Sequence, residues 1–237
     1  MAVRTAHTGS GIGTGAGAGT ATGPAARART EPRPSPLPLT ERQEARRRRI
    51  LDTSTRLACQ GGFDAVQMRE VAESSGVALG TLYRYFPSKI HLLVAIMEDQ
   101  LGLLRLALRN RPPAATAPAE RVAETLLRAF RGLQREPKLA DAMVRALIFA
   151  DRSVNAEVDT VSRLTRTIIA DAMGKTAPGE AGTGQEQAAG PSGACLSAVR
   201  VIEHTWHAAL VTWLSGRATV AQATEDIRTV CALLDHV

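Results

Sequence analysis

Residues 71–85 read VAESSGVALGTLYRY, and this stretch predicts how the first part of the chain folds. Ala72 is small enough for a second helix to pass close over it, and Gly76 tolerates the positive φ that turns a chain between two helices. The apolar side chains spaced to hold these two helices together are Val71, Val77 and Leu82. The stretch therefore predicts a helix-turn-helix, with helices at about 67–75 and 78–85.

The outer face of the second helix carries groups suited to nucleic acid. With Leu82 facing inward, the opposite face presents a hydroxyl, a guanidinium and two phenols, from Thr81, Arg84, Tyr85 and, at its edge, Tyr83. Such groups bond phosphate oxygens and base edges in a major groove of DNA. The alternative for Tyr83 is packing against the first helix of the chain, which begins after Thr40, because aromatic rings often fill the cores of small helical domains.

The run GTLYRYFPSK, residues 80–89, lies in a longer stretch, 50–97, that resembles the DNA-binding domain of the TetR family of transcriptional regulators. The resemblance implies an all-α fold and extends over about 40–237. It implies a three-helix DNA-binding domain at 39–87, followed at 88–237 by a larger helical domain. That second domain would bind a small molecule and dimerise through its last two helices.

Carried over by position, the resemblance assigns DNA contacts in and around the helix-turn-helix. The matching residues are Gln67, Arg69, Thr81, Tyr83, Arg84, Tyr85 and Lys89. Lys89 would bind phosphate at the positive end of the following helix. Gln67 stands where the family often has Thr, which gives a weaker cap and a longer arm.

Four consecutive arginines, residues 46–49, lie in the predicted first helix. Successive residues of a helix point about 100° apart, so at most two of the four can face DNA. We expect these to be Arg46 and Arg49, and the alternative is a solvated helix face.

Charge is concentrated at the start of the chain. Residues 1–49 hold nine Arg and three Glu, so their net charge equals the +6 of the whole chain. The alternating glycines and the prolines of residues 1–38 predict a disordered basic arm. The arm suggests an anionic partner, such as a flanking minor groove of DNA, although a merely solubilising tail is an equal alternative.

The composition favours helices, since 44% of residues are hydrophobic while only 3% are aromatic. The longest apolar run, Leu92–Met97, is far shorter than the roughly 20 residues of a membrane helix, and no apolar leader is present. Three cysteines without CxxC spacing fit reduced thiols. We therefore expect a cytoplasmic protein with no membrane association.

Apolar spacing and capping residues place the remaining helices. Thr40 caps a first helix that Gly61 and Gly62 end, and Ser88 caps a long helix that runs to about Asn110. Further helices are expected at about 117–135, 137–151, 153–173, 194–215 and 219–236, with a Gly-rich mobile loop at 174–193. The apolar stripes of the last two helices indicate either core or a docking surface.

Three stretches, at 65–69, 86–93 and 149–153 with 157–159 beyond, are similar to the KstR-type subfamily of cholesterol-catabolism repressors, and the second and third lie outside the helix-turn-helix core. This resemblance implies a coenzyme A thioester of a steroid acid as inducer, although the loop 174–193 departs from the subfamily. Candidate pocket walls, all large and mostly apolar, are Met143, Leu147, Phe149, Ile168, Met173, Trp206 and Trp213. Core or dimer packing is the alternative for each.

The helix-turn-helix and the resemblance to the TetR family together imply a homodimeric repressor that binds a palindromic DNA operator and is released from it when a large apolar inducer binds. A TetR-type regulator of drug efflux, or a helical enzyme or carrier of acyl thioesters, are the alternatives. No HExxH, P-loop or GxSxG motif is present, so we expect no enzyme and no cofactor. His204 and His207 share a helix face without a third metal ligand, so no metal site is expected.

Overall fold

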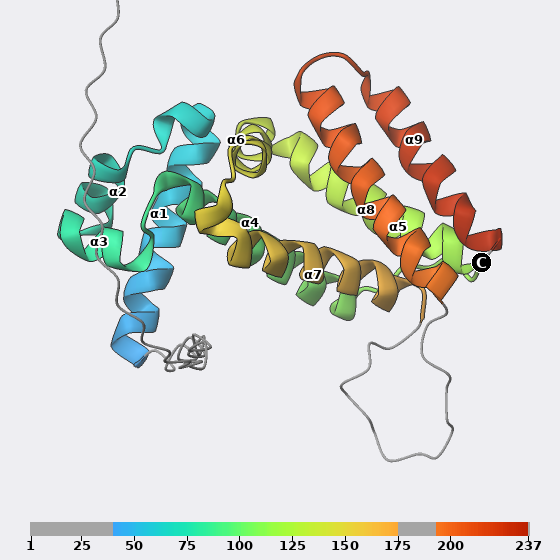
Figure 1. Cartoon of the computed structure of the whole chain (residues 1–237), viewed down its shortest axis with the longest axis horizontal. Helices are drawn as coiled ribbons and strands as arrows, with labels where there is room; N and C mark the ends of the chain where they lie inside the picture. Colours follow the sequence, from blue (N-terminus) through green and yellow to red (C-terminus); the bar gives the residue numbers. More distant parts are fainter. Residues whose placement is uncertain (1–39, 175–192, 237) are drawn as a thin grey trace, which may run out of the picture. The chain divides into compact units, whose positions relative to one another are not determined.

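The computed structural model describes residues 40–174 and 193–236, and within these ranges the chain is helical with no strand, as predicted (Figure 1). The elements are α1 (Glu41–Ala65), α2 (Met68–Ser75), α3 (Leu79–Tyr85), α4 (Lys89–Asn110), α5 (Pro118–Arg135), α6 (Pro137–Ile148), the 3-10 turn η1 (Arg152–Val154), α7 (Asn155–Ala172), α8 (Gly193–Leu214), α9 (Val220–Ala232) and the 3-10 turn η2 (Leu233–His236). The predicted arm 1–38 lies outside the described residues, as does the predicted loop apart from Gly174 and Gly193. No helix in the described ranges has the length and apolar character needed to cross a membrane.

The predicted caps form at the start of α1 and α4. The Thr40 hydroxyl accepts the backbone N–H of Gln43 at 3.4 Å, and the Gln43 side chain accepts that of Thr40 at 2.8 Å. This reciprocal pair is a capping box. At α4 the Ser88 hydroxyl accepts the backbone N–H of His91 at 3.4 Å. Both helices therefore begin where a side chain replaces a missing backbone acceptor.

The predicted end of the first helix at Gly61 and Gly62 is only partly right. Gly62 leaves helical geometry, with φ 69° and ψ −155°, but the chain regains one helical turn and α1 ends at Ala65. A Cβ atom at Gly61 would lie 2.5 Å from the Cβ of Ala65. The two glycines therefore permit a sharp kink and a close return of the chain.

The sixth helix is shorter than predicted: α6 ends at Ile148, whereas the sequence predicted an end near residue 151. The Asp151 carboxylate accepts the backbone N–H of Ser153 at 2.8 Å and its hydroxyl at 2.6 Å. An aspartate that bonds the backbone two residues ahead stabilises a turn in competition with helix. Residues 149–151 consequently form a turn that leads into η1.

The helix-turn-helix forms as predicted. Gly76 has φ 67° and ψ 36°, and the backbone N–H of Val77 donates to the Ala72 carbonyl at 3.0 Å. This left-handed residue closes α2 and redirects the chain into α3. The side chains of Val71 and Leu82 are fully buried between the two helices and α1.

Two cores hold the described helices together. The first core joins α1–α4 to α6, with Ile50, Leu82, Leu93, Leu139 and Met143 among its buried side chains. The second core joins α5, α8 and α9, which carry Phe130, Ile202, Trp206 and Ile227. Helix α6 belongs to both, because its next residue, Val144, is buried in the second core.

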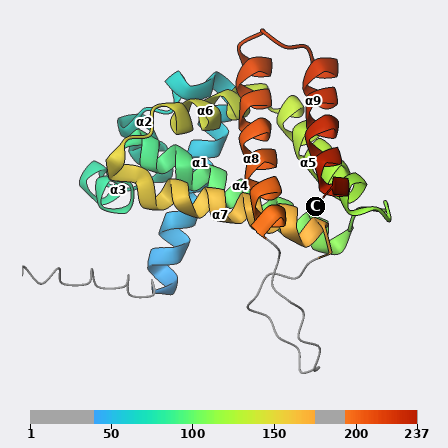
Figure 2. The same ribbon diagram turned by 45° about the vertical axis from the view of Figure 1, so that its right-hand side comes forward.

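Helices α8 and α9 run side by side as a hairpin, which the two views of Figures 1 and 2 both show. The predicted apolar stripe of α9 is buried except for its first residue, Val220, which is exposed because it lies at the first turn. Leu93, Met97, Leu101 and Leu104 recur every three or four residues and so form an apolar stripe on α4. Only Leu93 of this stripe is fully buried, and the other three residues are half-buried.

The glycine of the turn gives a test of the fold. Gly76→Ala is expected to lower the free energy of unfolding by roughly 1–2 kcal/mol, because alanine strains at positive φ. Gly80→Ala is the matched control: Gly80 lies inside α3, a Cβ there meets no atom within 4 Å, and alanine favours helix by about 1 kcal/mol. Urea unfolding followed by circular dichroism measures both. Equal stability of the two variants would contradict the left-handed turn.

Candidate DNA interface and interior cavity

The outer face of α3 carries the polar groups that the sequence predicted. Tyr83 is 45% exposed and Arg84 is exposed, while Leu82 between Thr81 and Tyr83 is fully buried. Thr81 is half-buried at the start of the helix. The phenol of Tyr83 and the guanidinium of Arg84 thus point away from the core, which does not fit the alternative that Tyr83 packs against the first helix, α1.

Tyr85, and not Tyr83, packs against the protein interior. Its hydroxyl donates to the backbone carbonyl of Gln43 at 3.4 Å, and its half-buried ring packs against the first core beside Phe86. Tyr85 therefore ties the end of α3 to the beginning of α1. A DNA contact by Tyr85 stays a prediction.

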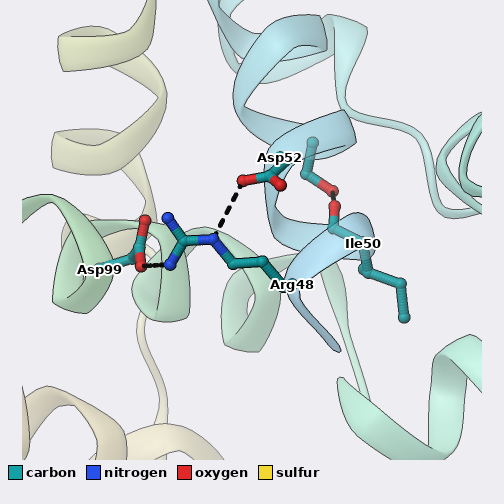
Figure 3. Close-up of polar contacts among 5 residues, drawn as sticks. Arg48, Ile50, Asp52 and Asp99 are labelled. Carbon is teal, nitrogen blue, oxygen red and sulfur yellow. Dashed lines mark hydrogen bonds and ion pairs between the residues drawn. The ribbon is translucent and has the colours of Figure 1, made fainter. Parts of the chain in front are cut away.

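The four consecutive arginines divide into two pairs. Arg48 bonds Asp99 of α4 at 2.7 Å and Asp52 at 3.3 Å, so it joins α1 to α4 (Figure 3). The Arg47 guanidinium lies 5.7 Å from the centre of the Phe86 ring. Arg46 and Arg49 form no ion pair with any of the described residues. These are the two arginines that the sequence predicted to contact DNA.

Gln67 and Arg69 lie at the start of α2 with exposed side chains, and Gln67 occupies the cap position without a capping hydrogen bond. Lys89 is the first residue of α4, as expected from the sequence. Its ammonium lies 3.8 Å from the centre of the Phe63 ring, and burial lowers its pKa. The contact of Lys89 with phosphate stays a prediction.

Lys89 is part of a junction cluster formed by Phe63, Asp64, Lys89, Arg145 and Phe149. The Arg145 guanidinium lies 4.4 Å from the centre of the Phe63 ring and bonds Asp64 at 3.3 Å. Phe149 meets Phe63 edge-on, with ring centres 5.6 Å apart. The cluster therefore fastens the end of α6 to the end of α1 and the start of α4 by cation–π and charge contacts.

His91 makes a second link near this junction, and sequence reasoning missed it. Its Nε2 lies 3.2 Å from the backbone carbonyl of Ser153, and its Nδ1 lies 2.9 Å from the Ser88 hydroxyl. Because a carbonyl only accepts, Nε2 is the donor of the first bond. His91 thus connects the first turn of α4 to the turn before α7.

A cavity of about 350 Å³, named the interior cavity, lies among α4, α5, α6, α7 and α8 and opens to the surface beside the exposed residues Leu103, Gly132 and Glu136. Its walls are mainly apolar, and its polar lining residues are Gln100, Arg128, Glu136, Thr165 and His207. Of the predicted pocket walls, Met143 and Trp206 line it. Its size is near the lower end of the range of small-molecule sites, roughly 300–1,000 Å³.

The other five predicted walls lie elsewhere. Leu147 lines a separate cleft, Phe149 is 54% exposed in the junction cluster, and Ile168 is buried away from both hollows. Trp213 packs edge-on against Phe130 with ring centres 5.0 Å apart, and Met173 packs on the second core. The walls that sequence reasoning missed include Leu101, Leu104, Leu133 and Leu210. The stripe of α4 was the available signal for the first two.

No group of three potential metal ligands occurs in the described ranges. His204 and His207 line the separate cleft, where Arg166 and Arg200 are their polar neighbours along with Glu203.

Family models match two parts of the chain. Residues 50–96 match the model described as bacterial regulatory proteins, tetR family, and residues 115–234 match that of the tetracyclin repressor-like C-terminal domain. The first match covers the helix-turn-helix and the start of α4. The second covers all the helices from α5 to α9.

Known proteins are also similar to this chain over most of its length and of their own. The HTH-type transcriptional repressor KstR of Rhodococcus jostii is 42% identical over 192 residues, which cover 81% of this chain and 84% of KstR. The crystal structure of a TetR transcriptional regulator from Rhodococcus sp. RHA1 is 37% identical, with a TM-score of 0.71, over 82% of this chain and 97% of that one. FadR of Thermus thermophilus, solved in complex with lauroyl-CoA, has a TM-score of 0.59 at 20% identity over 79% of this chain and 92% of its own, and so shares the fold.

The junction cluster is tested by removing its central cation. Arg145→Met is expected to lower the free energy of unfolding by about 1–2 kcal/mol, because it removes two half-exposed ion pairs and the stacking on Phe63. Arg131→Met, at an exposed arginine of α5, is the matched control and is expected to change stability by less than about 0.5 kcal/mol. Urea unfolding measures both. In a double-mutant cycle, Arg145→Met is expected to lower the free energy of unfolding less when Phe63 is already replaced by leucine. An equal loss with and without Phe63→Leu would contradict the stacking.

Proposed function

The chain belongs to the TetR family of bacterial regulatory proteins, and on this premise we propose that it represses transcription as a homodimer bound to a palindromic operator. An acyl-coenzyme A inducer releases it. The observation that carries the proposal is the outward placement of Tyr83 and Arg84 on α3 while Leu82 is buried. A recognition helix inserted in a major groove requires this arrangement.

The hairpin of α8 and α9 supports the dimer. The groove between the two helices is lined by Val201, Thr205, Ala208, Thr212 and Leu233, among others. Val201 and Leu233 are exposed although they are large and apolar. A two-fold axis through this surface pairs the same patch on both copies. Two α3 helices about 34–36 Å apart would then reach successive major grooves.

The coupling between ligand and DNA follows from α6. Leu139 and Met143 line the interior cavity and are also buried in the first core with α1 and α4. A ligand that enlarges the cavity displaces α6 and α4 together, and these helices set the position of α3. Release of DNA then needs only that the ligand bind the displaced state more tightly.

The lining of the cavity supports an apolar acyl group as the ligand body, since charged residues are confined to Arg128 and Glu136. FadR of Thermus thermophilus was solved with lauroyl-CoA, and KstR of Rhodococcus jostii is a repressor. We infer a coenzyme A thioester of a steroid acid, which would place the regulated genes in sterol catabolism. Release of the operator by drug molecules alone would favour the efflux alternative, and hydrolysis of the thioester would favour an enzyme.

The recognition helix is tested on an operator obtained by selecting genomic DNA fragments with the purified protein. Tyr83→Ala and Arg84→Ala are each expected to weaken operator binding about 10–100-fold, because each removes a contact worth about 1–3 kcal/mol. Fluorescence anisotropy measures the affinity, and size-exclusion chromatography checks the dimer. Arg217→Ala, at an exposed arginine between α8 and α9, is the control and should bind like wild type. Wild-type affinity in both α3 variants would reject this placement of the recognition helix.

The cavity is tested by filling it. Ala129 of α5 lines the interior cavity and is half-buried. Ala129→Phe is expected to keep operator binding and to raise the thioester concentration that releases the operator at least tenfold, because the ring occupies the space of the ligand. Ala156→Phe, at an exposed position of α7, is the control. The same anisotropy assay, with thioester titrated in, measures the release, and unchanged release by Ala129→Phe would place the ligand elsewhere.

A further inference from the structure

A second hollow adjoins the interior cavity. This outer cleft, of about 510 Å³, lies among α6, α7 and α8. Val144 and His207 line both hollows, so the two hollows meet at these side chains. Burial lowers the pKa of His207, which favours the neutral imidazole at this meeting point.

The outer cleft has an apolar half and a charged half. Its apolar residues are Val144, Leu147, Ile148, Val158, Val161 and Val211, and its charged residues are Arg166, Arg200 and Glu203. The Glu203 side chain is only 5% exposed, and its carboxylate bonds the Nε of Arg166 at 3.2 Å. That Nε also donates to the Ser162 carbonyl at 3.2 Å. Glu203 therefore holds Arg166 in place at the edge of the cleft.

A third hollow continues from the second. This outer groove lies between α7 and α8, and Arg166 and Arg200 line both it and the outer cleft. Arg163 adds a third guanidinium, and Thr167 and Ser197 add hydroxyl groups. Among the described residues that line these two hollows, the carboxylates are Glu203, which is paired with Arg166, and Asp159 in the groove.

The described residues that line the outer cleft and the outer groove include three arginines and two carboxylates, so their net charge is positive. Arg163 and Arg200 form no ion pair with any described residue, while Arg163 bonds the Thr160 hydroxyl at 3.0 Å and Arg200 the Ser197 hydroxyl at 3.4 Å. Guanidinium groups bind phosphate through paired N–H donors, and hydroxyl groups complete such sites. The surface is therefore suited to an anion with several phosphate oxygens.

We propose that the three hollows form one binding path for an amphipathic anion. Its apolar body occupies the interior cavity, its linker passes Val144 and His207 through the outer cleft, and its phosphorylated nucleotide head binds Arg163, Arg166 and Arg200. This assignment rests on the proposed function and deepens it, because it locates the head of the coenzyme A thioester. The arginines bind and position the head, whereas the residues of the interior cavity bind the apolar body.

The test uses full-length protein, and two variants. In Arg163→Ala/Arg200→Ala the head site loses two of its three guanidinium groups, while Arg166 is kept so that buried Glu203 stays paired. Arg109→Ala/Arg131→Ala removes two exposed arginines from α4 and α5 and is the matched control. The probes are the coenzyme A thioester of a cholesterol-derived steroid acid, the free steroid acid, and coenzyme A alone.

Isothermal titration calorimetry is expected to show at least a tenfold loss of thioester affinity in the head-site variant. Affinity for the free acid should be unchanged, binding of coenzyme A alone should be lost, and the control should match wild type. Equal affinity for the thioester in the head-site variant and wild type, or a wild type that prefers the free acid, would overturn the head site. A third outcome is that the variant loses coenzyme A binding while the thioester fails to release wild-type protein from the operator. This outcome would support the head site and reject the thioester as the inducer.

Discussion

Leu139 and Met143 of α6 are buried in the same core as α1 and α4, so the helix-turn-helix cannot separate from the cavity wall without opening that core. Burial of one such side chain is worth about 1.5–3 kcal/mol, whereas coupling between two ligand sites is typically about 1–3 kcal/mol. Separating α6 from α1 would expose both side chains and cost about 3–6 kcal/mol, more than such a coupling supplies. In the proposed mechanism a ligand would therefore shift α6 together with the helices packed on it. This packing would let the cavity control the spacing of the two proposed recognition helices.

Helix α4 also connects the helix-turn-helix to the cavity, because its two ends contact different parts of the molecule. Its first turn holds Lys89 against Phe63 and connects His91 to the turn before α7. Three turns later the same helix lines the cavity with Leu101 and Leu104. The junction cluster is charged and half-exposed, so its contacts can be exchanged for contacts with water at little cost. The first core resists separation, while the junction cluster permits adjustment, and a rigid-body shift of α4 and α6 needs both properties.

Local signals in the sequence predicted most of the fold. Gly76, Ser88 and the buried Leu82 act within a few residues of themselves, and their placement was right for that reason. Long-range contacts were not predictable. An apolar stripe shows that a helix face is buried but not what it faces, so Trp213 was assigned to the pocket although it packs on Phe130, while Leu101 and Leu104 were omitted. The Asp99 partner of Arg48 and the Phe63 partner of Lys89 lie tens of residues away along the chain, and no local pattern specifies them.

Helix α8 can serve two surfaces because neighbouring stripes of a helix face different directions. Arg200, His204, His207 and Val211 follow one another at spacings of three or four residues and line the outer cleft, together with Glu203 beside His204. Val201, Thr205, Ala208 and Thr212 repeat at the same spacing, one residue further on, and line the groove beside α9. Successive residues point about 100° apart, so the two stripes lie on adjoining faces of one rigid helix. Any movement of the cleft face is therefore also a movement of the face beside α9. A ligand that shifts α8 would alter the pairing of two subunits through that face without contact between ligand and partner.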